Sequence, residues 1–450
     1  MLFNSNSIIL SFSCQQFQCQ GMRIMEEEGN TQVITEYQST LSTDAIVCPQ
    51  CKGKVYVCGD YETILQDMPI WIGIKQEASV RYHRYRCREC HRSFAEDIEL
   101  KHPRTRVTTR AARWIEALLC LQMSVKSIQE LTGIHWGTIR TIHEEFMEAK
   151  LEERRRELKK KGYKPQLLAV DEFAIHKGHS YATCVIDLVE GDILWVGEGR
   201  AMKDFRKFFE ETDPDYLSEV KAVAMDMNAS YHLLVEENLP HACVVYDRYH
   251  MQAQYGRDVL GVVRLEEARR HQKQAKEIKQ AAAEEKDPAV KKQMKQSAKG
   301  EQNLYTSLKR SRWTLLMNQD KLLPEKAVAL KTILDAHSSV AICYALKEEM
   351  CDLFDIRDPE IARAKWLAWF EAAKSSGIEP LAKFAALKES KIDGLVSHAA
   401  YPISTGKLEG MNNRIKVSKR IGYGFRNDAY FFSLIRYLSL PSPLLSPKVP

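Results

Sequence analysis

The chain has 450 residues, of which 44% are hydrophobic and 28% are charged, the balance of a soluble globular protein with roughly two to four cores. We expect no membrane span because no apolar run reaches about 18 residues, and the net charge of +5 is too small to indicate nucleic acid alone. Twelve cysteines, only four of them in regularly spaced pairs, exclude a small disulfide scaffold and favour a reducing cytoplasm.

The first residues of the chain show no targeting signal. Residues 1–24 are polar and lack a basic start before the apolar Ile8–Leu10, so a signal peptide is not expected. Met22 and Met25 are alternative start sites. We therefore expect residues 1–44 to be a disordered or wrongly assigned N-terminus.

Two Cys-x-x-Cys pairs, Cys48 with Cys51 and Cys87 with Cys90, lie in residues 45–103. Four thiolates in two such pairs suit the tetrahedral geometry of structural zinc, so this segment is predicted to be a ribbon-like Zn²⁺ module. The 35 residues between the pairs exceed the common spacing and require a hairpin insert. Five arginines could add contacts to DNA phosphates: Arg81, Arg84, Arg86, Arg88 and Arg92.

Residues 104–150 have the period and boundaries of three helices. The first covers residues 111–121, Ser124 caps the second, which ends at Gly133, and Trp136 opens the third. This order is typical of a helix-turn-helix that reads base edges, although a three-helix bundle that binds nothing would look the same. The candidate DNA contacts are His135, Thr138, Arg140 and Thr141. The charge runs of residues 151–164 predict a solvated helical linker.

Residues 165–250 have the strand and helix order of an α/β domain. The apolar Leu167–Val170 is predicted to be a buried strand ending at Asp171, and Ala222–Met225 a later strand ending at Asp226. Three antiparallel strands, a helix, and then parallel strands alternating with helices are typical of an RNase H-like fold. Its first and fourth strands are neighbours, so the two aspartates are expected to face each other across one metal site.

A third carboxylate is expected from residues 401–440, where a capped helix start carries Glu409. Asn412 and Asn413 lie one turn further along, on the same helix face. Basic residues suited to gripping phosphate follow: Lys416, Lys419 and Arg420. Two aspartates and a glutamate suit two Mg²⁺ or Mn²⁺ ions, which predicts metal-dependent phosphoryl transfer on DNA.

The second metal ligand has an alternative, since an aspartate at a strand end is more often a turn residue than a ligand. Asp247 also ends a strand and lies close to His250, so either Asp226 or Asp247 could be the second carboxylate. Glu172 should point away from Asp171 and play a supporting part. Asp187 is a further competitor.

The 182 residues between Asp226 and Glu409 far exceed a connection within such a fold, which indicates an insertion over residues 251–400. Residues 261–310 are rich in Ala, Glu, Lys, Gln and Arg, a composition that predicts long exposed helices. For the later tryptophans, helix packing is the main expectation and stacking on a displaced DNA base the alternative: Trp313, Trp366 and Trp369. Residues 441–450 are expected to be a tail.

Five ordered segments resemble bacterial insertion-sequence transposases of the ISL3 group: Val170–Phe173, Ala224–Tyr231, Tyr246–His250, Leu408–Lys416 and Lys419–Phe425. The resemblance covers residues 45–437. It implies a DDE transposase on an RNase H-like core, with the triad on Asp171, Asp226 and Glu409 and a helical insertion that helps to hold DNA. Asp247 and His250 resemble a separate Asp-x-x-His motif, and Thr405 departs from the Asn common in relatives.

The resemblance also implies the partners and the location. The partners would be double-stranded DNA, both transposon ends and target, and further copies of the chain in a synaptic complex at the nucleoid. Two other functions would require fewer of these features. A non-catalytic regulator derived from a transposase would not need the intact carboxylates, and a nuclease for branched or hybrid DNA would not need a two-part DNA-reading N-terminus.

Overall fold

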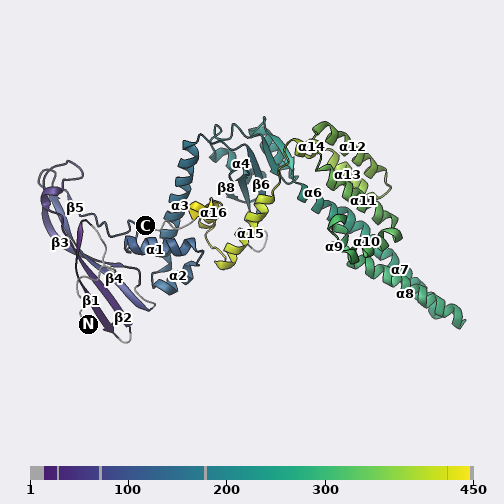
Figure 1. Ribbon diagram of the computed structural model, residues 1–450, viewed down its shortest axis with the longest axis horizontal. Helices are drawn as coiled ribbons and strands as arrows, with labels where there is room; N and C mark the ends of the chain where they lie inside the picture. The colour runs from purple at the N-terminus through teal and green to yellow at the C-terminus, as the bar shows by residue number, and fades with distance from the viewer. Residues whose placement is uncertain (1–14, 28–29, 70–72, 177–179, 423, 446–450) are drawn as a thin grey trace. The chain divides into compact units, whose positions relative to one another are not determined.

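In the computed structural model the chain forms two compact units (Figure 1). One unit comprises residues 1–163 and 413–450, and the other comprises residues 164–412. The structure describes residues 15–27, 30–69, 73–176, 180–422 and 424–445. Within these segments, the description covers only the backbone of Glu27, Asn30, Leu408 and Glu409.

The first unit contains a sheet of order β1-β2-β4-β3, with β5 paired to β4. Its strands are β1 (Phe17–Glu27), β2 (Asn30–Ser39), β3 (Val55–Gln66), β4 (Ile74–Cys87) and β5 (Ser93–Ala95). The expectation that residues 1–44 are disordered is wrong for the described part, because β1 pairs with β2 and β2 pairs in parallel with β4. The buried Phe17 and Tyr37 pack with Leu65 and Val80, which anchors both strands.

Three helices follow at the predicted positions: α1 (Thr109–Cys120), α2 (Val125–Thr132) and α3 (Trp136–Lys160). The Ser124 hydroxyl accepts a hydrogen bond from the Ser127 amide, and Gly133 ends α2 with φ of 70°. Both cap predictions are confirmed. The expected linker of residues 151–164 is the second half of α3, and its Arg154 and Leu158 are buried and not solvated.

The C-terminal helices differ in their packing from the prediction. They are α15 (Gly406–Ile421), α16 (Asp428–Leu438) and α17 (Ser442–Leu445), the last within the expected tail. We expected residues 401–440 to complete the α/β core, but the part from residue 413 belongs to the first unit. There the Tyr430 hydroxyl of α16 lies 2.6 Å from Nδ1 of the buried His143 on α3. Burial lowers the pKa of His143 to about 4, so its ring is neutral at pH 7.

The second unit begins with a sheet of order β10-β9-β6-β7-β8. Its strands are β6 (Leu167–His176), β7 (Ser180–Asp187), β8 (Ile193–Glu198), β9 (Ala222–Met225) and β10 (Cys243–Tyr246). β6, β7 and β8 are antiparallel, whereas β9 and β10 run parallel to β6. The predicted neighbours, the first and fourth strands, are therefore confirmed as β6 and β9.

Helices cover this sheet with apolar side chains. They are α4 (Met202–Glu211), α5 (Ala229–Asn238) and α6 (Arg248–Tyr255). Phe205 and Phe208 of α4 pack with Val170 and Val223 of the sheet. The prediction that the first strand ends at Asp171 is wrong, because pairing with β7 extends β6 to His176.

The predicted insertion, residues 251–400, begins within α6 and has helices joined by short connections as its regular structure (Figure 1). After a π-helical turn at Gly256–Leu260 come α7 (Gly261–Glu284), α8 (Pro288–Arg310), α9 (Arg312–Leu316), a 3-10 turn at Gln319–Lys321, α10 (Pro324–Ala336), α11 (Ser338–Leu353), α12 (Pro359–Ser375), α13 (Glu379–Glu389) and α14 (Ile392–Ala400). Trp366 and Trp369 are completely buried, which confirms packing for both, whereas Trp313 is 68% exposed. Among the helices described, none has an apolar stretch long enough to cross a membrane.

The two kinds of tryptophan predict different effects on stability. Trp366→Ala should lower the free energy of unfolding by about 3–5 kcal/mol, because it leaves a large cavity in the helical core. Trp313→Ala, the matched control, should change it by no more than about 0.5 kcal/mol because its ring is exposed. Denaturant unfolding monitored by circular dichroism measures both. Equal losses would contradict the packing described here.

Candidate metal-binding active site

The pairing of β6 with β9 places two aspartates at matching positions. Ala169 pairs with Ala224 in the last register step between these parallel strands. Asp171 follows Ala169 by two residues, and Asp226 follows Ala224 by two residues. Because neighbouring parallel strands lie about 4.8 Å apart, equivalent positions on them bring their side chains to one edge of the sheet.

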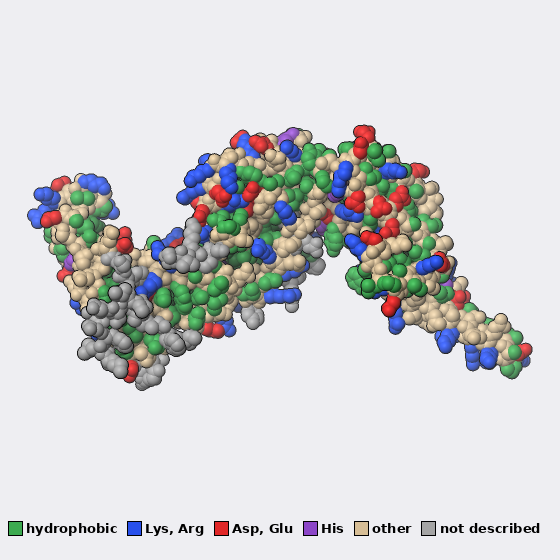
Figure 2. Space-filling model, in the orientation of Figure 1, with side chains coloured by type: hydrophobic (Ala, Val, Ile, Leu, Met, Phe, Trp, Pro, Cys, Tyr) green, Lys and Arg blue, Asp and Glu red, His purple; other side chains and the backbone are tan. Residues whose placement is uncertain are grey.

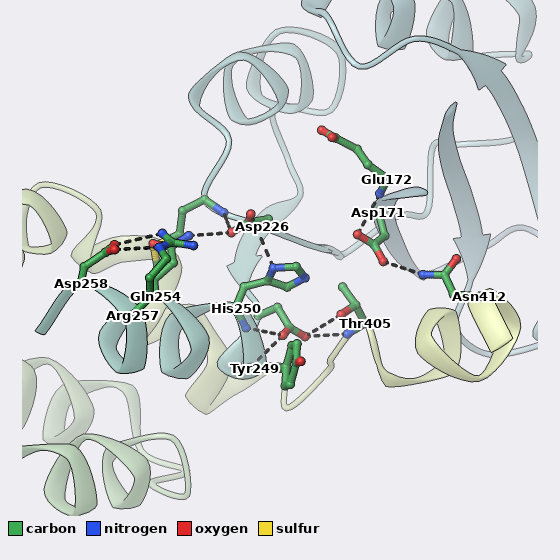
Figure 3. A network of polar contacts seen from close by, with 12 residues as sticks. Asp171, Glu172, Asp226, Tyr249, His250, Gln254, Arg257, Asp258, Thr405 and Asn412 are labelled. Carbon is green, nitrogen blue, oxygen red and sulfur yellow. Dashed lines mark hydrogen bonds and ion pairs between the residues drawn. The ribbon is translucent and has the colours of Figure 1, made fainter. Parts of the chain in front are cut away.

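The Asp171 carboxylate is oriented from both sides. Oδ1 accepts a hydrogen bond from the Glu172 amide at 2.8 Å, and Oδ2 accepts one from Nδ2 of Asn412 at 3.1 Å (Figure 3). Burial raises the pKa of Asp171, and the Glu172 amide and the nearby His250 act in the opposite direction. A buried carboxylate that burial disfavours as an anion gains from a bound cation.

Asp226 follows β9 directly and remains open to solvent, with its side chain 44% exposed. Oδ1 accepts hydrogen bonds from the Met227 amide at 2.6 Å and from Nε2 of Gln254 at 3.3 Å. Oδ2 lies 3.5 Å from Nδ1 of His250. Sequence analysis missed Gln254, although its spacing of four residues from His250 puts both on one face of α6.

Asp247, the alternative second ligand, is 1% exposed and fully engaged. Oδ1 caps α6 by accepting the amides of Tyr249 at 2.8 Å and His250 at 3.2 Å. Oδ2 accepts the amide of Thr405 at 2.7 Å and its hydroxyl at 3.1 Å (Figure 3). Four hydrogen bonds match the roughly four lone-pair sites of a carboxylate, which leaves none for a metal. Asp247 therefore ties the start of α6 to the segment that begins α15.

Glu409 lies on α15, but its side chain is outside the described residues. The same helix reaches β6 through the hydrogen bond that Nδ2 of Asn412 donates to Asp171. The basic residues follow on α15 within the first unit, where Lys416 and Arg420 are exposed. Burial lowers the pKa of Lys419. Asn413 is exposed.

The competing carboxylates have other partners. Glu172 points away from Asp171, as predicted (Figure 3). Burial raises the pKa of Glu172, opposed by a hydrogen bond with Tyr231. Asp187 is 1% exposed, and its Oδ1 accepts the Val189 amide in the turn after β7. Asp187 is thus a turn residue and not a candidate ligand.

The four predicted cysteines come together at one end of the β3–β4 pair. The Sγ atoms of Cys48 and Cys90 lie 3.6 Å apart and those of Cys51 and Cys87 lie 3.4 Å apart. One ligand atom from each lies within 4.8 Å of the others. The Cys51 amide lowers the pKa of Cys48 to about 6, and the Cys90 amide lowers the pKa of Cys87, whereas the neighbouring Cys87 raises the pKa of Cys51. Four converging sulfurs, two of them favoured as thiolates, fit a tetrahedral Zn²⁺ ion.

Comparison with known proteins shows the family to which the chain belongs. A family model described as a transposase, of the ISL3 type, matches residues 168–435, which include every carboxylate discussed above. The chain is 32% identical over 396 residues to the transposase for insertion sequence element IS1001 of Bordetella parapertussis, covering 87% of this chain and 88% of that protein. This chain belongs to the ISL3 group of insertion-sequence transposases.

A more distant relative shares a shorter region. The transposase for insertion sequence element IS1557 of Mycobacterium tuberculosis is 24% identical over 269 residues, covering 59% of this chain and 58% of the relative. The match to the IS1001 transposase covers 396 residues. It is therefore longer than the compact unit that contains Asp171 and Asp226, residues 164–412.

In this transposase the candidate DNA-reading residues at the start of α3 differ in exposure and in the hydrogen bonds that their side chains already make. The Arg140 guanidinium donates to Glu144 at 2.8 Å and lies 5.0 Å from the centroid of the Tyr430 ring. The Thr141 hydroxyl donates to the Gly137 carbonyl at 3.0 Å. Thr138 is half-buried, and His135 is exposed and caps α3 through Nδ1. Arg140 would have to leave Glu144 to contact a base.

Because Asp247 makes more buried hydrogen bonds than Asp226, replacing it should destabilise the folded transposase more. Asp247→Ala should lower the free energy of unfolding by about 2–4 kcal/mol, because it removes a helix cap and orphans the buried Thr405 donors. Asp226→Ala, at a half-exposed position, should cost less than about 1 kcal/mol. Urea denaturation measures the difference. A larger loss for Asp226→Ala would reverse the assignment of these two side chains.

Proposed function

We propose that this transposase cleaves the DNA at the ends of its insertion sequence and joins those ends to target DNA. The observation that carries the proposal is the matched placement of Asp171 and Asp226 on neighbouring parallel strands, within a chain of a transposase family. The strand order supports assigning the sheet to an RNase H-like core, with Glu409 of α15 as the third carboxylate of a DDE triad.

The donor set fits a hard divalent cation. Asp171 and Asp226 offer carboxylate oxygens, the ligands that Mg²⁺ and Mn²⁺ prefer, and Glu409 would add a third carboxylate. When bound, the ions would lower the pKa of the attacking water or 3′-hydroxyl and would stabilise the negative charge on the leaving oxygen. Asp247 is not proposed as a ligand, because its four hydrogen bonds already occupy both oxygens.

The surrounding side chains hold these carboxylates in place. Asn412 orients Asp171 from α15, and Gln254 orients Asp226 from α6. His250 stands beside Asp226, where it can accept or donate a proton near the reacting phosphate. Asp247 positions His250 by capping α6, and it positions the start of the Glu409 helix through Thr405.

The N-terminal unit would locate the terminal inverted repeats. The cysteine cluster would form a zinc ribbon, and the three-helix module would form a helix-turn-helix. In the helix-turn-helix, Thr138, Arg140 and Thr141 would contact the DNA bases. Lys416, Lys419 and Arg420 would contact phosphates, and the exposed Trp313 would stack on a displaced base. Two ends are joined in one complex, so the active form would be a homo-oligomer.

Mutation of the triad tests the chemistry. Asp171→Asn, Asp226→Asn and Glu409→Gln should each reduce Mg²⁺-dependent cleavage of end DNA to background, because each removes an anionic metal ligand. Binding to the end, measured by gel shift, should persist. Asn412→Ala should lower the cleavage rate by about 10–100-fold, since it orients a ligand without being one.

Separate outcomes distinguish the alternatives. Cleavage that survives Asp226→Asn but is lost in a folded Asp247→Asn protein would move the second ligand to Asp247. Binding without cleavage by the wild type would favour the regulator. Cleavage without joining of the 3′-hydroxyl end to target DNA would favour a nuclease.

The cysteine cluster gives an independent test. Cys48→Ser should remove one equivalent of zinc from the purified chain, because a thiolate ligand is lost. End binding should fall while the free energy of unfolding of residues 164–412, the other compact unit, stays unchanged. Cys58→Ser, an exposed cysteine outside the cluster, is the matched control. Equal zinc content in both variants would rule out the zinc module.

A further inference from the structure

A group of metal-ligating side chains lies in the helical insertion, away from the residues of the candidate active site. Glu267 and His271 lie four residues apart on α7 and so share one helix face. His337 lies between α10 and α11. One ligand atom from each of the three lies within 4.8 Å of the other two. We propose that this group binds a Zn²⁺ ion.

The two histidines are buried, and each has one ring nitrogen that makes no hydrogen bond within the described residues. His271 is 7% and His337 is 3% exposed, and their ring centroids lie 5.0 Å apart. Within the described residues, Nε2 of His271 and Nδ1 of His337 make no hydrogen bond. Burying a polar atom without a partner is unfavourable, and a metal ion between the rings would satisfy both atoms at once.

The other face of His271 has the partner that a metal-bound histidine usually has. Nδ1 of His271 lies 2.5 Å from Oε2 of Glu301, which comes from α8. A carboxylate on one ring nitrogen holds the proton there, orients the ring and leaves the other nitrogen free to bind metal. The free nitrogen is Nε2, the atom without a partner.

The third ligand has one competitor. Oε2 of Glu267 lies 2.7 Å from Nη2 of Arg270, one turn along α7. The Arg270 side chain is 58% exposed and the Glu267 side chain 15% exposed, so the guanidinium approaches from the solvent and can be displaced. Glu267 also faces His337, whose Nδ1 is 3.9 Å from Oε2. An ion bound here would replace Arg270 as the positive charge beside Glu267.

The ligand chemistry selects zinc over the ions of the active site. Two imidazole nitrogens and one carboxylate oxygen suit Zn²⁺, whereas Mg²⁺ prefers oxygen ligands alone. The ion would join α7 to the α10–α11 junction, at the base of the hairpin formed by α7 and α8.

Figure 2 shows Lys and Arg side chains along one edge of this hairpin. Its exposed lysines include Lys273, Lys276, Lys279, Lys295 and Lys299.

Zinc content of the full-length protein tests the proposal without any activity measurement. Purified protein is loaded with Zn²⁺, desalted and analysed by elemental mass spectrometry. His271→Gln and His337→Gln should each lose one equivalent of zinc relative to the wild type. His398→Gln is the matched control, because His398 is also buried with an unpartnered Nδ1, on α14 and outside the group. It should keep the wild-type zinc content.

Cobalt distinguishes this site from the cysteine cluster. In the Co²⁺-loaded protein, the two histidine variants should lose ligand-field absorption while the thiolate-to-cobalt charge-transfer band of the cysteines remains. Spectra that are unchanged in both histidine variants would mean that the only cobalt is at the cysteines, and this would overturn the proposal. Equal zinc in the wild type and a folded His337→Gln protein would overturn the proposal.

A milder variant covers the case in which the histidine variants do not fold. Glu301→Gln keeps the size of the side chain and should weaken zinc binding by about 10–100-fold, because it loses the charge that orients His271. Competition with a chromophoric chelator measures this affinity, with Glu277→Gln on the exposed side of α7 as control. An unchanged affinity for Glu301→Gln would also overturn the proposal.

Discussion

The parallel pairing of β6 with β9 is the constraint on which the rest of the candidate active site depends. These strands are separated by more than 40 residues of chain, yet the register Ala169 to Ala224 brings Asp171 and Asp226 to the same edge. Apolar side chains on both strands are buried against α4 and α5, so a shift of register would move the core as well as the carboxylates. The packing of the sheet therefore defines the spacing of the ligands.

Asp247 shows how one buried charge can organise several elements. It follows β10, caps α6 and accepts both donors of Thr405, 158 residues further along the chain. A buried carboxylate is stable as an anion only with such a set of donors. Those donors also bring His250 and the start of α15 toward the two aspartates. Thr405 thus supplies both a donor side chain and a backbone amide to Asp247.

The helical insertion carries its own internal order. Its core of buried aromatic residues, including Trp366, Trp369 and Phe370, is continuous with the α/β sheet. The α7–α8 hairpin extends beyond that core and has few apolar contacts of its own, with mainly alanines buried along it. The hydrogen bond between His271 of α7 and Glu301 of α8 adds a polar contact within this hairpin.

The sequence by itself determined the features that depend on neighbouring residues. Helix caps such as Ser124 and Gly133, the Cys-x-x-Cys pairs and the order of strands and helices follow from short patterns, because each is stabilised within a few residues. Even there, residues 17–39 were missed, since their strands are held by partners on β4 and by the core beneath.

Only the tertiary structure decided which side chains meet. Asp226 and Asp247 both follow a strand and are equivalent in sequence, but one is open and the other is saturated by Thr405. The sequence also did not predict that α16 packs on α3, or that His271 lies beside His337. The physical reason is that burial and hydrogen-bond partners come from residues far apart in the chain, whereas sequence patterns record the backbone conformation of each stretch.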